Sequence, residues 1–223
     1  AEEQTDAAKK NDLLKEGRAL FATVLGPFKN SIEAMTKAVE ALYEKGESRD
    51  LTEAEESEKQ KQEFQRDLSE FLLAEAYASY AKTFPPTEDG RAENFKHALK
   101  LYEQYVDERG NFQKLLFYSY VGRGEMLMEL KQYGDAIEQY GELVYVEPLY
   151  VPQDPDGKKA VLDMIKDVVI RAYYGWTRAL LMDGKAAEAY KASQQIDDNP
   201  KAKGWKDHPM GTLLTFERSK ALA

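Results

Sequence analysis

The chain has 223 residues, of which 43% are hydrophobic and 32% are charged, and its formal net charge is −9. This composition can form a folded core, and its acidic balance argues against nucleic acid or an anionic membrane surface as the main ligand. The absence of cysteine excludes disulfides, thiol nucleophiles and thiolate metal sites. No apolar run approaches the roughly 20 residues that a membrane-spanning helix needs, so we expect no membrane insertion.

The chain begins with Ala-Glu-Glu-Gln instead of methionine. This beginning fits a mature protein after removal of a signal peptide, which would be periplasmic or extracellular, and it fits a trimmed end equally well. Export and a cytoplasmic location therefore both stay open.

Helical periodicity begins near the start of the chain. Residues 5–25 predict one helix, and Gly26-Pro27 is expected to end it and to start a second helix that Gly46 ends. The apolar residues of the first helix lie mostly along one stripe, and those of the second share one face. They are Leu13, Leu14, Leu20, Phe21, Val24 and Leu25 in the first helix, and Phe28, Ile32, Met35, Val39 and Leu42 in the second.

A third helix is predicted to start after Thr52, which forms a capping box with Glu55. Residues 52–63 contain almost no apolar side chain and predict a solvated helix face, whereas an apolar stripe starts at Phe64. Pro85-Pro86 should end this helix, because neither proline has an N–H and the second restricts the first.

Six further helices are predicted over residues 92–108, 112–130, 133–146, 159–182, 186–195 and 209–222. Between the third and fourth of these, residues 148–157 contain three prolines and a glycine and predict a long loop. No segment alternates as a β-strand would, so the predicted fold class is all-α.

Small and aromatic residues recur within the later helices at the spacing of a helical hairpin. One unit carries Tyr120, Gly124, Leu127, Tyr133, Ala136, Tyr140, Leu143 and Pro148. A second carries Tyr173, Trp176, Leu180, Gly184, Ala189 and Pro200, and a third pairs Leu73, Ala74 and Tyr77 with Ala98, Tyr102 and Tyr105. This pattern resembles the tetratricopeptide repeat (TPR), whose units are helix–turn–helix.

The resemblance covers residues 67–200. It departs from the family pattern at Thr177, where Gly or Ala is usual, and in the third unit, whose turn is about twelve residues too long. Residues 1–66 would form helices outside the repeats, and residues 201–223 would contain a capping helix, all within a single elongated domain. The alternative is an irregular helical bundle whose close contacts happen to use Ala and Gly.

The resemblance implies a right-handed superhelix of antiparallel helix pairs, with a groove lined by the first helix of each pair. The implied partner-binding residues are Tyr118, Val121, Glu125, Met128, Arg171, Tyr174, Arg178 and Met182, with Glu129, Phe71, Glu75 and Ser79 as further candidates. Some TPR domains grip a partner's C-terminal carboxylate with Lys, Asn and Arg. We do not expect that mode, because Val121, Glu125 and Glu129 stand on the corresponding surface.

Residues for chemistry are sparse. His97 and His208 are isolated, and Asp154-Pro-Asp-Gly157 lacks the later acidic ligands of a calcium loop. The Gly122-Arg-Gly124 stretch lies inside a predicted helix and lacks the features of a phosphate loop. We therefore expect no catalytic, metal or cofactor site.

The predicted function is a non-enzymatic adaptor or assembly scaffold that binds a protein or peptide in the groove. The alternative is a structural subunit that forms homo-oligomers through its terminal helices.

Overall fold

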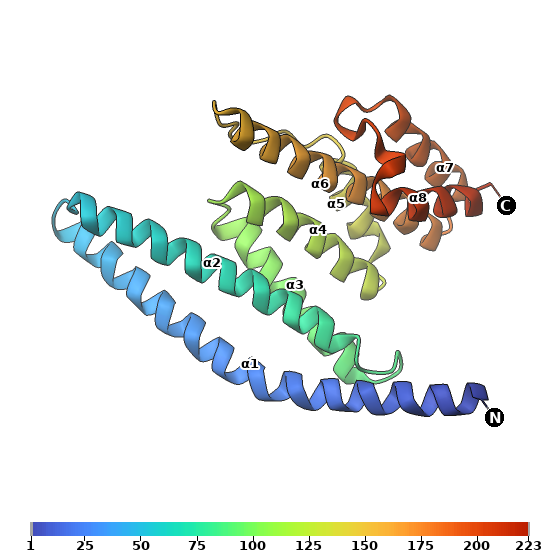
Figure 1. Ribbon diagram of the computed structural model, residues 1–223, viewed down its shortest axis with the longest axis horizontal. Helices are drawn as coiled ribbons and strands as arrows, with labels where there is room; N and C mark the ends of the chain where they lie inside the picture. The colour runs from blue at the N-terminus through green and yellow to red at the C-terminus, as the bar shows by residue number, and fades with distance from the viewer. Residues whose placement is uncertain (1, 223) are drawn as a thin grey trace. The chain divides into compact units, whose positions relative to one another are not determined.

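The computed structural model describes residues 2–222, with side chains at residue 9 and from residue 11 onward. Over this range all of its regular secondary structure is helical and it contains no β-strand, which confirms the predicted all-α class (Figure 1). The chain divides into two compact units, one up to residue 105 and one from residue 106. The helices are α1 (Glu2–Ser48), α2 (Glu53–Ala81), α3 (Asp89–Glu108), α4 (Gln113–Glu129), α5 (Tyr133–Leu143), α6 (Pro155–Met182), α7 (Ala186–Gln195) and α8 (Pro209–Lys220), with the 3-10 helices η1 (Ile196–Asp198), η2 (Pro200–Ala202) and η3 (Trp205–Asp207).

The expected break at Gly26-Pro27 is wrong, because α1 runs through it as one helix of 47 residues. Pro27 removes one backbone hydrogen bond, and a helix accommodates this by bending; α1 is bent along its length (Figure 1). The buried face also stays in helical register across the proline, since Leu25 and Ile32 are both buried. Continuous packing on one side therefore outweighs the missing bond.

The first part of α1 uses a narrower apolar face than expected. Leu25 is buried, whereas Leu13, Leu20 and Val24 are 68%, 66% and 46% exposed. Phe21 packs against Tyr80 with the ring centroids 5.7 Å apart. Three of the six apolar residues predicted to share one stripe therefore point away from the core.

Polar contacts join the second half of α1 to the first half of α2. The predicted capping box is confirmed, because the Glu55 N–H donates to the Thr52 hydroxyl and the Thr52 N–H donates to the Glu55 carboxylate. The Tyr43 hydroxyl donates to Glu63 at 2.5 Å, and the Lys59 ammonium lies 4.3 Å from the Tyr43 ring centroid. The polar start of α2 is thus mostly solvated, but its last residue, Glu63, is buried.

Aromatic contacts join α2 to α3. Helix α2 ends before Pro85-Pro86, as predicted. The Tyr102 hydroxyl donates to Glu75, and the Tyr102 ring lies 5.9 Å from Phe71. Two candidate groove residues of α2, Phe71 and Glu75, therefore contact the neighbouring helix.

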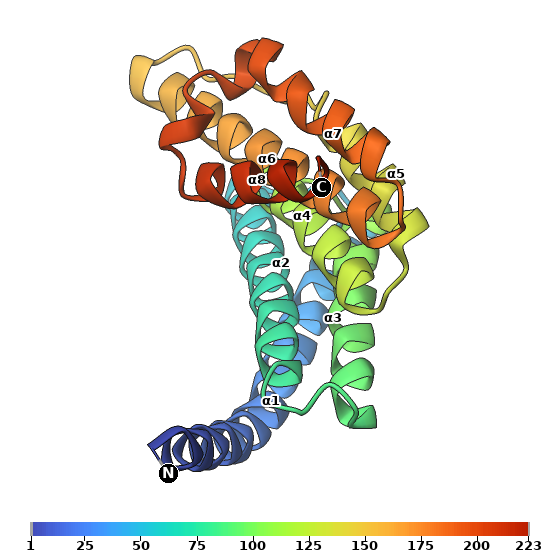
Figure 2. The same cartoon turned by 90° about the vertical axis from the view of Figure 1, so that its right-hand side faces the viewer.

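Helix α6 is central to the second unit. It packs against α4, α5, α7 and α8 (Figure 2). Four of its side chains, Val168, Val169, Ile170 and Ala172, are completely buried. Such burial on all sides is expected only of a helix that is surrounded by others.

Helix α6 also begins earlier than predicted. Asp154 is its N-cap and accepts a hydrogen bond from the Gly157 N–H at 2.7 Å. Pro155 occupies the first turn, where a proline needs no N–H partner. The Asp-Pro-Asp-Gly sequence is therefore a helix start, and the predicted loop ends at Asp154.

No helix among residues 2–222 combines the length and the apolar character needed to cross a bilayer.

Candidate functional site

The candidate site is a polar surface on α6, at which α4 and α8 also contribute side chains. The carboxylate of Asp167 gathers three groups from these elements. Its Oδ2 accepts from Arg171 Nε at 2.8 Å, and its Oδ1 lies 2.9 Å from His208 Nε2. The Tyr118 hydroxyl of α4 donates to the same carboxylate. We call these four residues the Asp167 cluster.

The Asp167 cluster is mostly shielded from water, since the side chains of Asp167 and His208 are 21% and 16% exposed. Burial of Tyr118, followed by the nearby carboxylate, raises the pKa of its hydroxyl to about 12. Tyr118 is therefore a neutral hydrogen-bond donor at physiological pH.

His208 is engaged at both ring nitrogens. Its Nδ1 accepts from the Met210 N–H at 3.2 Å, which makes His208 the N-cap of α8. Its Nε2 then carries the hydrogen, and this N–H donates a hydrogen bond to Asp167. His208 therefore both caps α8 and contacts Asp167 of α6. With no free lone pair, the imidazole is not placed to take a proton from a substrate.

A second cluster surrounds Tyr140 of α5. A Cβ on Gly124 of α4 would lie 2.6 Å from the Tyr140 ring, and one on Gly175 of α6 would lie 2.3 Å from it. The ring is therefore held between two glycines, and Gly124 allows α4 to pack closely against α5. Burial raises the pKa of the Tyr140 hydroxyl well above its usual range, and the Glu125 carboxylate acts in the same direction.

Three of the predicted partner-binding residues line one pocket of about 480 Å³ between α6 and α8. The pocket is lined by Tyr174, Arg178, Leu181, Met182, Glu217 and Lys220. Lys220 is paired with Glu217 at 3.1 Å, and the Arg178 side chain is exposed. We call this pocket the α6–α8 pocket. It has a charged rim and apolar Leu and Met side chains.

The predicted residues differ in accessibility. Glu125, Arg178 and Met182 are exposed, and Met182 exposes 54% of its surface. Half-buried positions are Tyr118, Met128, Glu129, Arg171 and Tyr174. Val121 is only 4% exposed. The structure brings Tyr118 and Arg171 together at Asp167, and it brings Tyr174, Arg178 and Met182 together at the α6–α8 pocket.

The remaining groove candidates lie on α2. Glu75 and Ser79 are exposed and Phe71 is half-buried.

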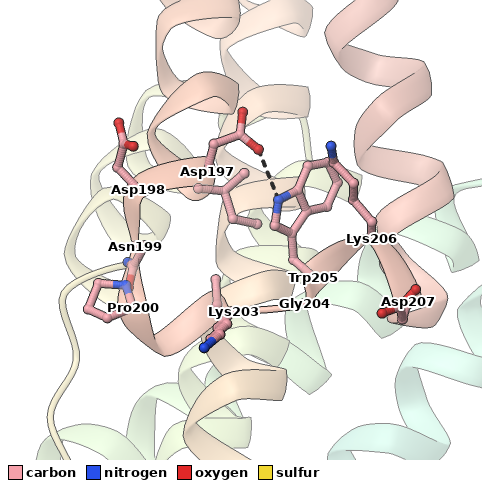
Figure 3. A pocket seen from close by; sticks show the side chains of 11 residues that line it. Asp197, Asp198, Asn199, Pro200, Lys203, Gly204, Trp205, Lys206 and Asp207 are labelled. Carbon is pink, nitrogen blue, oxygen red and sulfur yellow. Dashed lines mark hydrogen bonds between the residues drawn. The ribbon is translucent and has the colours of Figure 1, made fainter.

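The segment that joins α7 to α8 forms a further pocket, of about 580 Å³ (Figure 3). There the Trp205 indole N–H donates to Asp197 Oδ1 at 3.1 Å, and Arg218 Nη1 donates to Asp197 Oδ2 at 3.0 Å. The Arg218 guanidinium lies 5.3 Å from the Trp205 ring centroid. Both oxygens of Asp197 are therefore occupied, and the contacts hold the segment together.

Sequence reasoning missed Asp167, Trp205 and Arg218. Asp167 lies four residues before Arg171, and that spacing on a helix is a signal for an ion pair. No comparable local signal links Asp167 to His208, because 41 residues separate them.

Among the described side chains, those of residue 9 and residues 11–222, no group of three or more His, Asp or Glu is placed to hold a metal ion. His97 Nε2 lies 3.9 Å from the carboxylate of Glu93, four residues earlier on α3.

Comparison of the sequence with protein-family models and with curated proteins gives no match.

Proposed function

We propose that this protein is a non-catalytic binding module that holds a peptide or a helix of another protein against α6. The observation that carries the proposal is the α6–α8 pocket, which collects Tyr174, Arg178 and Met182 in one accessible place. Its occupant would bury apolar side chains against Met182 and Leu181 and would place a carboxylate near Arg178. Such a combination favours an amphipathic, acidic helix or peptide.

The TPR-like arrangement is part of this proposal. The pairs α4–α5 and α6–α7 are each joined by short turns, and consecutive helices from α4 to α7 pack on one another. The Tyr140 ring between Gly124 and Gly175 supports this reading, because small residues at such places allow neighbouring hairpins to approach closely.

A peptide selection would test the proposal. Peptides selected on the full chain from a random library would be measured by isothermal titration calorimetry against the wild type and against the double variant Tyr174→Ala/Arg178→Glu. The control is Lys191→Glu, which makes the same type of charge reversal at an exposed position on α7. We expect the double variant to weaken binding at least tenfold and the control to change it less than twofold.

Binding that both variants leave unchanged would refute the proposed site. Circular dichroism of each variant would show whether a loss of binding comes from a loss of helix.

One observation favours the alternative, a subunit that associates with itself. Leu13, Leu20 and Val24 are exposed on the first half of α1, outside the predicted repeats. Light scattering coupled to size-exclusion chromatography, over a concentration series, would detect such association. Under this alternative, a dimer of the 223-residue chain should become a monomer in the variant Leu13→Glu/Leu20→Glu, whereas a monomer at every concentration would contradict it.

A further inference from the structure

One face of α1 is exposed over most of the length of the helix. Its residues recur at alternating steps of four and three, which is the spacing of a face that packs along another helix. From residue 13 to residue 38 they are Leu13, Gly17, Leu20, Val24, Pro27, Ser31, Ala34 and Ala38. Gly17 is half-buried and the other seven are exposed. We call these eight residues the outer stripe.

The outer stripe is separate from the face of α1 that packs on α2. Leu25, Ile32 and Val39 are buried on that other face, and each follows a member of the outer stripe by one position. One position along an α-helix corresponds to a rotation of about 100°. Helix α1 therefore has two neighbouring faces with the spacing of helix contacts, of which one is covered by α2 and the other is exposed.

The two halves of the outer stripe differ in the size of their side chains. The first half holds the large residues Leu13, Leu20 and Val24, and the second half holds the small residues Ser31, Ala34 and Ala38. In a second copy that runs antiparallel about a two-fold axis beside Gly26, Ala38 faces Leu13 of the first copy. The same axis places Ser31 opposite Leu20. Large side chains that face small ones can interdigitate without leaving voids.

Charges beside the outer stripe favour the same register. The flank that points away from α2 carries exposed charged residues at heptad positions, namely Lys9, Glu16, Lys37 and Glu44. In the antiparallel register, Glu16 faces Lys37 of the second copy and Lys9 faces Glu44. A shift of one heptad would instead place Glu16 opposite Glu44 or Lys9 opposite Lys37. The face is therefore complementary to itself in charge as well as in size.

Lys37 is available for such a contact. It pairs with Glu33 of its own helix at 2.8 Å, but the two side chains are 70% and 66% exposed. An ion pair this exposed contributes little to stability, so the ammonium can also approach a carboxylate of a second copy at small cost.

The first turns of α1 extend past the end of α2. Arg18 donates to the Thr83 carbonyl oxygen at 2.7 Å, just beyond the last residue of α2. The part of α1 before Arg18 continues beyond this point (Figure 1). An unpacked helix of such length is at best marginally stable in water. In the antiparallel arrangement, the second half of α1 from the second copy lies along these turns and covers Leu13.

We propose that the outer stripe is the interface of a two-fold dimer, in which the α1 helices of two copies pack antiparallel about an axis beside Gly26. This inference rests on the self-associating subunit proposed above as the alternative function, and it specifies the surface, the direction and the register. The α6–α8 pocket contributes no residue to this interface.

Cysteine cross-linking tests the direction and the register, because the chain has no cysteine of its own. Leu13→Cys and Ala38→Cys are prepared separately in the full chain, one of them with a tag of distinct mass, and are treated with a short bismaleimide. We expect a mixture of the two variants to form the mixed cross-linked pair. Each variant alone should stay uncross-linked, because an antiparallel pair separates the two copies of residue 13 by about 38 Å.

Charge exchange tests the pairing of Glu16 with Lys37. Glu16→Lys turns two attractions of the dimer into two repulsions and should raise the dissociation constant, measured by sedimentation equilibrium, about tenfold. Glu16→Lys/Lys37→Glu restores opposite charges and should return the constant to within about threefold of the wild type. The matched control is Lys15→Glu, a charge reversal on the side of α1 away from the outer stripe, and it should change the constant less than about twofold.

The outcomes separate the arrangement from self-association as such. If light scattering shows a dimer but Leu13→Cys cross-links with itself, or the mixed pair does not form, the antiparallel arrangement is overturned and self-association stands. A dissociation constant that Glu16→Lys leaves unchanged would likewise overturn the register. A monomer at every concentration would overturn both the dimer and the alternative function, whereas peptide binding is judged by its own calorimetric test.

Discussion

Substituting alanine for Gly175 tests the packing that places α6 against α5. In an ordinary helix this change is stabilising, because alanine has the higher helix propensity by about 1 kcal/mol. Here the added Cβ would lie 2.3 Å from the Tyr140 ring. Helix propensity raises the stability and the clash lowers it, so the sign of the measured change in stability shows which effect is larger.

The magnitude follows from how little the Tyr140 ring can move. On its other side, a Cβ at Gly124 would already lie within 2.6 Å of the ring, so the ring has no space to shift away. Overpacking of a core costs about 1–3 kcal/mol, and a ring confined on both sides belongs at the upper end. After the gain of about 1 kcal/mol from helix propensity, we expect Gly175→Ala to lower the free energy of unfolding by about 2 kcal/mol.

Urea unfolding followed by tryptophan fluorescence is a suitable assay, because both tryptophans, Trp176 and Trp205, lie after residue 106. The matched control is Gly134→Ala on α5, where an added Cβ would meet nothing within 4 Å. That variant should keep or raise the stability, by up to about 1 kcal/mol. The urea concentration at the midpoint of unfolding should fall for Gly175→Ala and should stay or rise for Gly134→Ala. The slope of the unfolding free energy against urea concentration should be the same for both variants.

Combining Gly175→Ala with Tyr140→Leu checks the cause. The smaller side chain leaves room for the Cβ, so the cost of the glycine substitution should shrink in the double variant. Equal effects of Gly175→Ala and Gly134→Ala would refute the argument that the glycine is required for close approach.

Three further predictions concern single side chains. Thr52→Ala removes half of the capping box with Glu55 and should destabilise the start of α2 by about 1 kcal/mol, measured by thermal unfolding and by hydrogen exchange at α2. The raised pKa of Tyr118 means that the folded state keeps a proton which the unfolded chain loses, so stability should fall as pH rises from about 10 to about 12. Tyr118→Phe should lose this part of the alkaline dependence, and a wild-type curve that stays flat there would contradict it. Arg218→Met should lower the protection of the segment between α7 and α8 by at least tenfold in hydrogen exchange, since it removes the hydrogen bonds that the guanidinium donates to Ser193 and to Asp197; unchanged protection would show that the guanidinium is dispensable.

Local signals in the sequence identified most helix ends correctly. Thr52 and Glu55 cap α2 as their spacing predicts, and the double proline at 85–86 follows its end. These signals succeed because the hydrogen bonds that they make lie within a few residues of chain. At Gly26-Pro27 a local signal gave the wrong answer, since burial of the same face before and after the proline outweighs one missing hydrogen bond.

The sequence by itself thus determined the all-helical class, the helix caps and the small residues that permit close packing. Only the tertiary structure decided which distant groups meet: Asp167 with His208 across 41 residues, and Tyr140 with Gly175. The physical reason is that caps and periodicity act over a few residues, whereas a side chain's neighbours across helices depend on how whole helices pack. Asp167 illustrates the difference, because an acidic residue on a helix looks solvated until packing places a tyrosine and a histidine beside it.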